Sequence, residues 1–174
     1  DGDPVGGNGP PTYAGNWIAD DDLNPYDLAE GRAPEAPGEV VIDKAAAKAG
    51  DLAVGDTTIV RTPEPIEVTI VGLATFGEAD SQGPITWAAF TDEFAEEVVL
   101  RQPGQVTRIV ASAEDGVGQD ELARRIDAVL PDGVETLTGA ELTEEEETAL
   151  QEDFLGFLRI FMLVFAGIAL VVAT

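Results

Sequence analysis

The chain has 174 residues, of which 34 are Asp or Glu and 9 are Lys or Arg, so its formal net charge is −25 at pH 7. This charge disfavours direct binding to nucleic acid or to an anionic membrane surface. The chain has no Cys and no His, which removes disulfides, thiolate metal sites and the commonest general base. We therefore predict no catalytic, cofactor-binding or metal-binding residue in this chain, and no enzyme activity.

Residues 1–38 are rich in Gly, Pro, Asn and Asp and show almost no helical or strand periodicity. Dipeptides such as Gly-Gly, Pro-Pro and Asn-Pro mark turns, so we expect an extended loop. Its aromatic residues include Tyr13, Trp17 and Tyr26. They either pack onto the body of the protein or form a surface that contacts a ligand.

Residues 39–75 are predicted to form a β-rich unit with one helix. The expected elements are a strand at 39–42, a helix at 44–49 that begins at the capping residue Asp43, and β-branched strands at 57–60 and 66–73. The connection at 61–65 contains two prolines. Because proline has no N–H to donate to a ladder, we expect this connection to interrupt the sheet.

The next segment contains a loop, a strand and a helix. We expect the loop at 76–84, where a plain connection is one interpretation and the wall of a cleft is the other. A strand follows at 85–90. Thr91 is placed to cap a helix at 92–100, with acids in the first turn and Arg101 after the last, as the helix dipole prefers.

Residues 105–138 are predicted to form a β-α-β unit. Apolar residues alternate over 105–113, which is typical of a half-buried strand. The helix at 119–130 has an apolar stripe of Leu122, Ile126, Val129 and Leu130. A return strand is expected at 134–138, so the fold class of residues 1–139 as a whole is α+β.

A long helix is expected from about Glu141 to the last residue. Thr138 and Glu141 have the spacing of a capping box, and Thr143 and Glu146 repeat it. Residues 154–174 then contain a single charge, that of Arg159, and about 20 apolar residues suffice to cross a bilayer. We predict a stalk helix at 140–153 and a truncated transmembrane helix at 154–174, with Phe154, Phe161, Phe165 and Leu170 in the apolar span.

Two features of this terminal helix have alternative interpretations. A buried helix of a soluble protein is the other possibility for residues 154–174, but no polar face follows residue 160. Arg159 is either an interfacial anchor whose long side chain reaches the headgroups, or the partner of an acid on another helix.

Runs of acids at 20–22 and 144–147 offer the oxygen ligands that Ca²⁺ and Mg²⁺ prefer. Neither run has the alternating acids and the glycine of a calcium loop. We therefore interpret both runs as solvated acidic surface. The high acidity also fits a protein adapted to high salt.

Three stretches carry a resemblance to a known family. They are GRAPEAPGEVVIDKAAAKAGDLAVGDTTIV, then EVTIVGLATFGEADS, and then TGAELT leading into FLGFLRIFMLVFAGIALVVAT. Their order, with a domain followed by a span, resembles FtsX-like (MacB-type) ABC transporter permeases, particularly the actinobacterial ones. The likeness extends from about Trp17 to Thr174.

This resemblance implies an extracytoplasmic domain, comprising residues 1–153 with the stalk, at the plasma membrane. Residues 39–75 would correspond to the Sabre-like part and 105–138 to the porter-like part. ATP would bind a separate cytoplasmic ATPase subunit, and the permease would act as a dimer in membrane lipid. The cargo would be a lipid, lipoprotein, peptide or drug, and the output export or mechanotransmission.

Two other functions remain open at this level. The first is a single-span, membrane-anchored surface module for binding or adhesion. The second is a membrane-tethered hydrolase that uses two carboxylates, although the sequence does not single out such a pair of acids.

Overall fold

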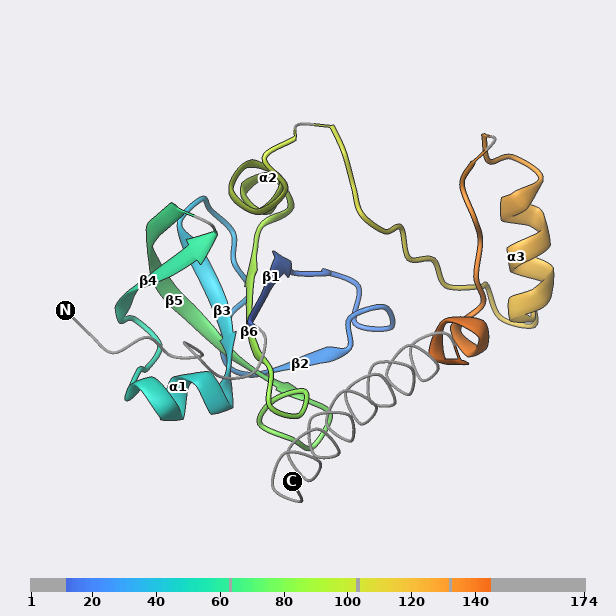
Figure 1. The fold of residues 1–174 in the computed structure, drawn as a ribbon. Coiled ribbons are helices and arrows are strands. Elements are labelled where there is room, and N and C mark those ends of the chain that lie inside the picture. The colour runs from blue at the N-terminus through green and yellow to red at the C-terminus, as the bar shows by residue number, and fades with distance from the viewer. Residues whose placement is uncertain (1–11, 63, 103, 132, 145–174) are drawn as a thin grey trace, which may run out of the picture. The chain divides into compact units, whose positions relative to one another are not determined.

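The computed structural model describes residues 12–62, 64–102, 104–131 and 133–144. The chain divides into two compact units, Asp1–Ser112 and Ala113–Thr174. Each unit is described by itself below. The first contains a β-sheet with helices, and the described part of the second contains helices (Figure 1).

The first unit is built on a six-stranded mixed sheet with the order β1-β6-β3-β5-β2, in which β4 also pairs with β5. Its strands are β1 (Thr12–Asn16), β2 (Tyr26–Gly31), β3 (Glu39–Asp43), β4 (Thr57–Thr62), β5 (Glu64–Phe76) and β6 (Thr86–Phe90). The pairs β1–β6 and β3–β5 are parallel, whereas β2–β5, β3–β6 and β4–β5 are antiparallel. The sheet therefore extends beyond the β-rich segment 39–75.

Strand β5 is long enough to pair with two strands along one edge. Its first half pairs with β4, from Thr62↔Glu64 to Thr57↔Thr69, and its second half pairs with β2. The prediction that residues 61–65 interrupt the ladder is therefore wrong, because Arg61 pairs with Pro65. Pro65 is tolerated because β3 pairs with β5 only from Thr69 onward, so Pro65 has a free edge toward which its nitrogen can face.

A close approach between β2 and β5 explains two glycines. Gly31 has φ +78°, and a Cβ there would lie 2.2 Å from the carbonyl oxygen of Val71. A Cβ on Gly72 would lie 2.5 Å from the carbonyl oxygen of Arg32 and 2.8 Å from Leu28 Cδ1. The register of β2 also shifts between Leu28 and Glu30, so the bulge and the two glycines occur together.

Two helical segments begin at the predicted caps. α1 (Lys44–Gly50) begins after Asp43, whose side chain accepts a hydrogen bond from the N–H of Ala46. α2 (Asp92–Ala95) begins after Thr91, whose hydroxyl accepts from the N–H of Phe94, and it continues as the π-helical turn η1 (Glu96–Leu100). Both caps are confirmed, because side-chain oxygens at these positions satisfy amides that the helix leaves free.

The two faces of the sheet are covered differently. On the first face, residues of α1, α2 and η1 pack on a cluster that contains Val40, Ile70 and Phe90, each 0 % exposed. On the second face, Val41, Val71, Ala74 and Tyr26 form a separate cluster with Trp17, Phe76 and Trp87. No helical residue belongs to this second cluster in the described part of the chain.

The N-terminal segment contains more structure than its composition suggests. Residues 1–38 were expected to be an extended loop, but β1 and β2 lie within them. Both are short and lie at the ends of the strand order. Their sequences, TYAGN and YDLAEG, lack the alternation that identifies a strand, because an edge strand needs few buried side chains.

In the second unit, α3 (Gln119–Asp127) confirms the predicted amphipathic helix. The two strands of the predicted β-α-β unit are not present. Residues 105–113, nearly all of which belong to the first unit, and residues 134–138 form no ladder. Val106 and Ile109 are 69 % and 81 % exposed. Alternating apolar residues make a strand only when another strand supplies backbone partners, so the predicted β-α-β unit reduces to its helix.

The predicted stalk is described only at its beginning. Residues 139–144 are helical, and the capping box that precedes them is present. Glu141 Oε2 accepts from the N–H of Thr138 at 2.8 Å, and Thr138 Oγ1 accepts from the N–H of Glu141 at 3.2 Å. The rest of the predicted stalk and the whole of 154–174 lie outside the described residues.

Candidate functional site

An aromatic cluster occupies the second face of the sheet. The rings of Tyr26 and Trp87 stack with centroids 3.8 Å apart and planes 10° apart. Phe76 packs edge-on against Tyr26 at 5.5 Å, and Trp17 lies 6.1 Å from Trp87. The geometry matches the offset and T-shaped arrangements that aromatic pairs prefer. The cluster gathers β2, β5, β6 and the segment that follows β1.

The same face carries a row of residues that crosses the whole sheet. Tyr13 pairs with Trp87 in the β1–β6 ladder, and Asp43 pairs with Ala74 in the β3–β5 ladder. Ala74 in turn pairs with Leu28. Paired residues in a ladder point to the same face. Tyr13 and Leu28 therefore lie at the two ends of the row, and they are 56 % and 40 % exposed.

Asp43 joins the two halves of this row and is fully buried. Its Oδ2 accepts a hydrogen bond from the main-chain N–H of Trp87 at 2.6 Å, and its Oδ1 accepts from the N–H of Ala46 at 2.7 Å. Burial raises the pKa of this carboxyl, and these N–H donors oppose the rise. Asp43 therefore holds α1, β3 and β6 together, which is a structural role.

The loop between β5 and β6 is fastened at two points. Gln82 Oε1 accepts a hydrogen bond from the hydroxyl of Tyr26 at 3.3 Å. Asp80 pairs with Lys44 at 3.5 Å and also with Lys48. The hydrogen bond from Lys48 is the main reason why the pKa of Asp80 is lowered. The pKa of Tyr26 is raised, mainly by burial and also by the charge of Asp43. The loop thus connects α1 with the aromatic cluster.

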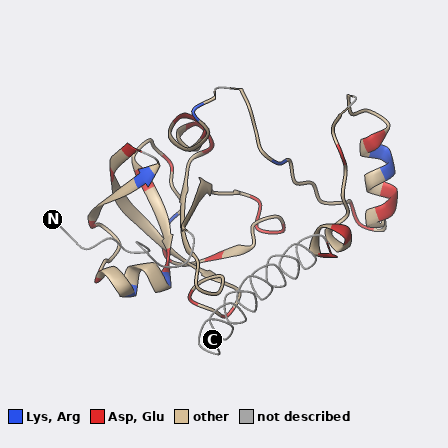
Figure 2. Ribbon diagram, viewed as in Figure 1, with Lys and Arg blue, Asp and Glu red and all other residues tan. Residues whose placement is uncertain are grey.

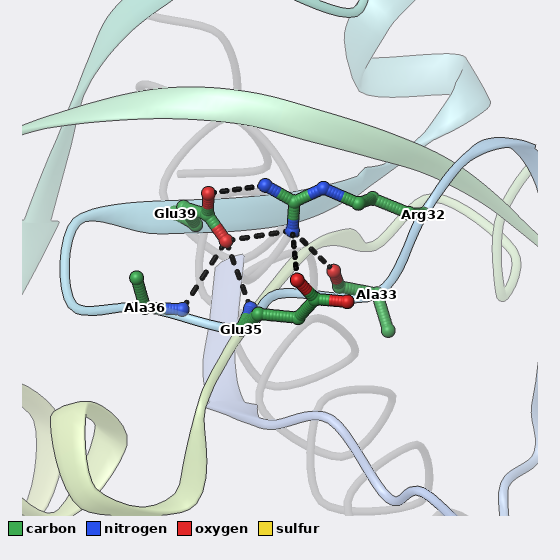
Figure 3. Close-up of polar contacts among 5 residues, drawn as sticks. All are labelled: Arg32, Ala33, Glu35, Ala36 and Glu39. Atoms are coloured by element: carbon green, nitrogen blue, oxygen red, sulfur yellow. Dashed lines mark hydrogen bonds and ion pairs between the residues drawn. The ribbon is translucent and has the colours of Figure 1, made fainter.

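The turn between β2 and β3 contains a second charged cluster (Figure 3). Glu39 accepts hydrogen bonds from both terminal nitrogens of Arg32 and from the N–H groups of Glu35 and Ala36. The Arg32 hydrogen bond, with these amides, lowers the pKa of Glu39 to about 2. All four donors come from residues 32–36, so this cluster shapes the turn and does not form an open site.

Charge is distributed unevenly over the described residues. Acidic side chains lie along both units, whereas Lys and Arg are confined to a few places (Figure 2). Helix α3 carries both acidic and basic side chains, and its Glu121 forms ion pairs with Arg124 and Arg125. Within the described residues, no group of three or more acids could hold a metal ion. The run at 20–22 is not part of any such group.

The structure brings together two of the three aromatic residues named from the sequence. Trp17 and Tyr26 both belong to the cluster. Tyr26 is buried, which favours a packing role for its ring over contact with a ligand. Tyr13 is exposed on the same face. Of the stalk and span residues, Glu141 has its capping role. Phe154, Arg159, Phe161, Phe165 and Leu170 lie outside the described residues.

The sequence analysis did not identify Trp87 or Phe76 as members of the site. It also did not predict that Asp43 is buried and accepts a hydrogen bond from Trp87. Trp87 falls in the predicted strand at 85–90, and Asp43 was identified only as a helix cap. Nothing local in the sequence indicates that these residues meet, because they lie on three strands.

Among the described residues, no helix is both long and apolar enough to cross a membrane.

Comparison with known proteins identifies the family. A model described as the MacB-like periplasmic core domain matches residues 2–129, which is more than half of the chain and includes the whole sheet and α3. Comparisons with curated proteins and with solved structures gave no significant match. The family is one of transporters, not of catalytic enzymes. The chain therefore belongs to the MacB-like periplasmic core domain family and is, in general terms, a component of an ABC transporter permease with an extracytoplasmic segment.

Proposed function

We propose that this chain is the extracytoplasmic and stalk portion of a permease subunit that couples cytoplasmic ATP hydrolysis to export or mechanotransmission. The observation that carries the proposal is the family match over residues 2–129. The apolar sequence at 154–174 supports it, because about 20 apolar residues cross a bilayer. In this proposal residues 1–153 lie outside the plasma membrane.

The helix that starts after Thr138 is the element through which movement would reach the domain. Its capping box fixes the helix start, and a helix transmits displacement along its axis because its backbone hydrogen bonds are internal. ATP would bind a separate subunit, and two permease subunits would act together. The cargo would be a lipid, lipoprotein, peptide or drug.

The test uses the full parent protein with its ATPase. Residues 1–174 contain no cysteine, so labelling is compared with that of the parent without the introduced cysteine. A single cysteine replaces Val129, which is 81 % exposed, or Ile59, which is 54 % exposed. In intact cells, a membrane-impermeant maleimide should label both positions. No labelling before lysis would refute the extracytoplasmic placement.

Coupling is tested with the same variants after purification with the ATPase. Spin labels at Val129→Cys should report a distance between the two permease subunits that changes when ATP replaces the nucleotide-free state. An ATPase that binds but does not hydrolyse ATP should hold the complex in the ATP-bound distance. If no ATPase copurifies and the distance ignores nucleotide, the single-span binding module becomes the better account.

A further inference from the structure

Strand β4 forms an edge of the sheet with which no other described segment pairs. Its only ladder is the one with β5, and it lies at one margin of the sheet (Figure 1). Within the described residues, no backbone hydrogen bond joins β4 to a segment other than β5. An open strand edge presents a row of N–H and C=O groups that can pair with another strand.

The register shows which groups of β4 point outward. In an antiparallel ladder, hydrogen-bonded and non-hydrogen-bonded residue pairs alternate. Arg61 lies opposite Pro65, which has no N–H to donate, so this pair belongs to the non-hydrogen-bonded class. Alternation puts Ile59 and Thr57 in the same class. The N–H and C=O groups of Thr57, Ile59 and Arg61 therefore point away from β5, and all three residues are exposed.

The other two edge strands have features that oppose pairing, and β4 lacks them. β2 contains Asp27 and Glu30, and its register shifts between Leu28 and Glu30. β1 has five residues, and Asn16 at its end donates to Asp92 of α2 at 2.7 Å. Short length, charges, bulges and neighbouring elements are the features that protect edges. β4, with the sequence TTIVRT, has no acid, no proline and no register shift.

The charge distribution suits this edge to contact with another acidic surface. None of the 34 acids lies in β4, whose single charge is that of Arg61. The acids nearest in sequence have other partners, because Asp56 accepts from the N–H of Ala53 at 2.8 Å and Glu64 pairs with Arg101 at 3.3 Å. With a net charge of −25, two copies repel each other over most of their surface. A contact between copies therefore requires a strand without acids, as β4 is.

We propose that β4 pairs in antiparallel orientation with β4 of a second copy of this chain, about a twofold axis at Ile59. Outward-facing residues form the hydrogen-bonded pairs, so Ile59 lies opposite Ile59 of the second copy and Thr57 lies opposite its Arg61. The two Ile59 side chains, each 54 % exposed in one copy, then shield each other from water. The same patch on both copies forms the contact, as twofold symmetry requires. The inference goes beyond the proposed coupling function.

This pairing keeps the acids of the two copies apart. The exposed acid nearest to the axis on this face is Glu67, which lies opposite Ile59 on β5. In the paired sheet, two β4 strands separate Glu67 from Glu67 of the second copy, so their Cα atoms would be about 15 Å apart. This distance exceeds the screening length of about 8 Å at physiological salt. Self-repulsion at the junction is therefore small.

Cysteine cross-linking tests the pairing and its register. The protein is the full parent in detergent micelles without nucleotide, compared with the parent that lacks the introduced cysteine. Ile59→Cys should give a disulfide-linked dimer under mild oxidation, because Cα atoms of a hydrogen-bonded pair lie about 5.5 Å apart, within disulfide range. Glu67→Cys, on the same face, is the matched control and should stay monomeric. Thr57→Cys and Arg61→Cys should each stay unlinked alone and should link when they are coexpressed.

Three substitutions at Ile59 separate backbone pairing from side-chain contact, with the coexpressed Thr57→Cys and Arg61→Cys variants as the readout. Ile59→Pro removes an outward N–H that β5 does not use, so β4 should stay in the sheet while the linked dimer falls at least about tenfold. Ile59→Thr keeps this N–H and should change the linked dimer by less than about threefold. Ile59→Asp leaves the backbone unchanged but places two acids face to face, and should lower the dimer about tenfold. About 0.5 M NaCl should partly restore it.

Each contrary result overturns the pairing for a different reason. Equal cross-linking of Ile59→Cys and Glu67→Cys would show random collision. Cross-links that persist in both Ile59→Pro and Ile59→Asp would show contact without strand pairing. No cross-link, with the amides of Thr57 and Ile59 protected from hydrogen exchange, would assign the edge to a different strand. No cross-link with fast exchange would show an unpaired edge. Because no measurement uses ATP, failure here and failure of the coupling proposal are distinguishable.

Discussion

The main-chain N–H of Trp87 on β6 donates a hydrogen bond of 2.6 Å to the buried carboxylate of Asp43 on β3. The same carboxylate caps α1 through the N–H of Ala46. One side chain thus fixes a strand, a helix start and the position of the aromatic ring that stacks on Tyr26. The aromatic face depends on this connection, because it orients β6 relative to β3.

Replacing Asp43 by Ala should destabilise the first unit by about 3 kcal/mol, since it removes a helix cap and leaves the N–H of Trp87 without its acceptor. Asp43→Asn should cost less, because its amide oxygen can still accept one of the two hydrogen bonds. Urea unfolding followed by tryptophan emission measures both. Asp27→Ala, at an exposed position of β2, is the control. Equal midpoints for the Asp43 and Asp27 variants would contradict the assigned role.

The Arg32–Glu39 cluster predicts a pH dependence of stability. Glu39 has a pKa of about 2 in the folded chain against a usual 4.5, so the folded state binds this proton less readily than the unfolded state. The contribution is therefore present above about pH 4.5 and is lost as the pH falls toward 2. In Glu39→Gln, stability at pH 7 should fall by about 1 kcal/mol, and the loss between pH 4.5 and 2 should be smaller. A parallel pH profile for both proteins would rule out this contribution.

Gly72 should not tolerate a larger side chain. A Cβ there would lie 2.5 Å from the carbonyl oxygen of Arg32, and backbone cannot move aside as a side chain can. Gly72→Ala should therefore destabilise the sheet by about 2 kcal/mol. Gly15→Ala on β1 is the matched control, since nothing lies within 4 Å of its Cβ position. The control should be neutral or slightly stabilising, and a tolerated Gly72→Ala would show that β2 and β5 can separate.

The capping box at the start of the stalk can be tested locally. Thr138→Ala removes the hydroxyl that accepts from the N–H of Glu141 and should weaken the first turn by about 1 kcal/mol. Hydrogen exchange of the amides at 139–144 should then be about fivefold faster. Thr136→Ala is the control, because the Thr136 hydroxyl is buried without a hydrogen-bond partner. Equal exchange rates in the two variants would mean that the cap does not determine the helix start.

The net charge of −25 predicts that salt stabilises the fold. Like charges repel in the compact state, and ions screen this repulsion. The thermal midpoint should therefore rise markedly from low salt to about 2 M KCl. A flat response would exclude adaptation to high salt as the origin of the acidity.

Sequence reasoning succeeded where the signal is local. The caps at Asp43, Thr91 and Thr138 depend on a side chain reaching an amide three residues away, so the spacing alone identifies them. The strands at 39–42, 57–60, 66–73 and 85–90 were also predicted, because they are rich in β-branched or aromatic residues that suit a buried sheet. The helix at 119–130 was found from its apolar stripe, although its last residues are not helical.

Sequence reasoning failed where a strand depends on a pairing strand that lies far away along the chain. The strands β1 and β2 are edge strands in a segment that has the composition of a loop, and each forms because β6 or β5 offers a ladder. The segment 105–113 has the composition of a strand but no partner within the described residues. In both cases the backbone hydrogen bonds, and not the side-chain pattern, decide the outcome.

The sequence by itself determined the acidity of the chain, its lack of cysteine and histidine, its helix starts and the family resemblance that the family match confirms. These follow from composition and from contacts between residues close along the chain. Only the tertiary structure placed Tyr13, Trp87, Asp43, Ala74 and Leu28 in one row across the sheet. Strand order and register decide which residues share a face, and both are set by pairing between residues that are distant in sequence.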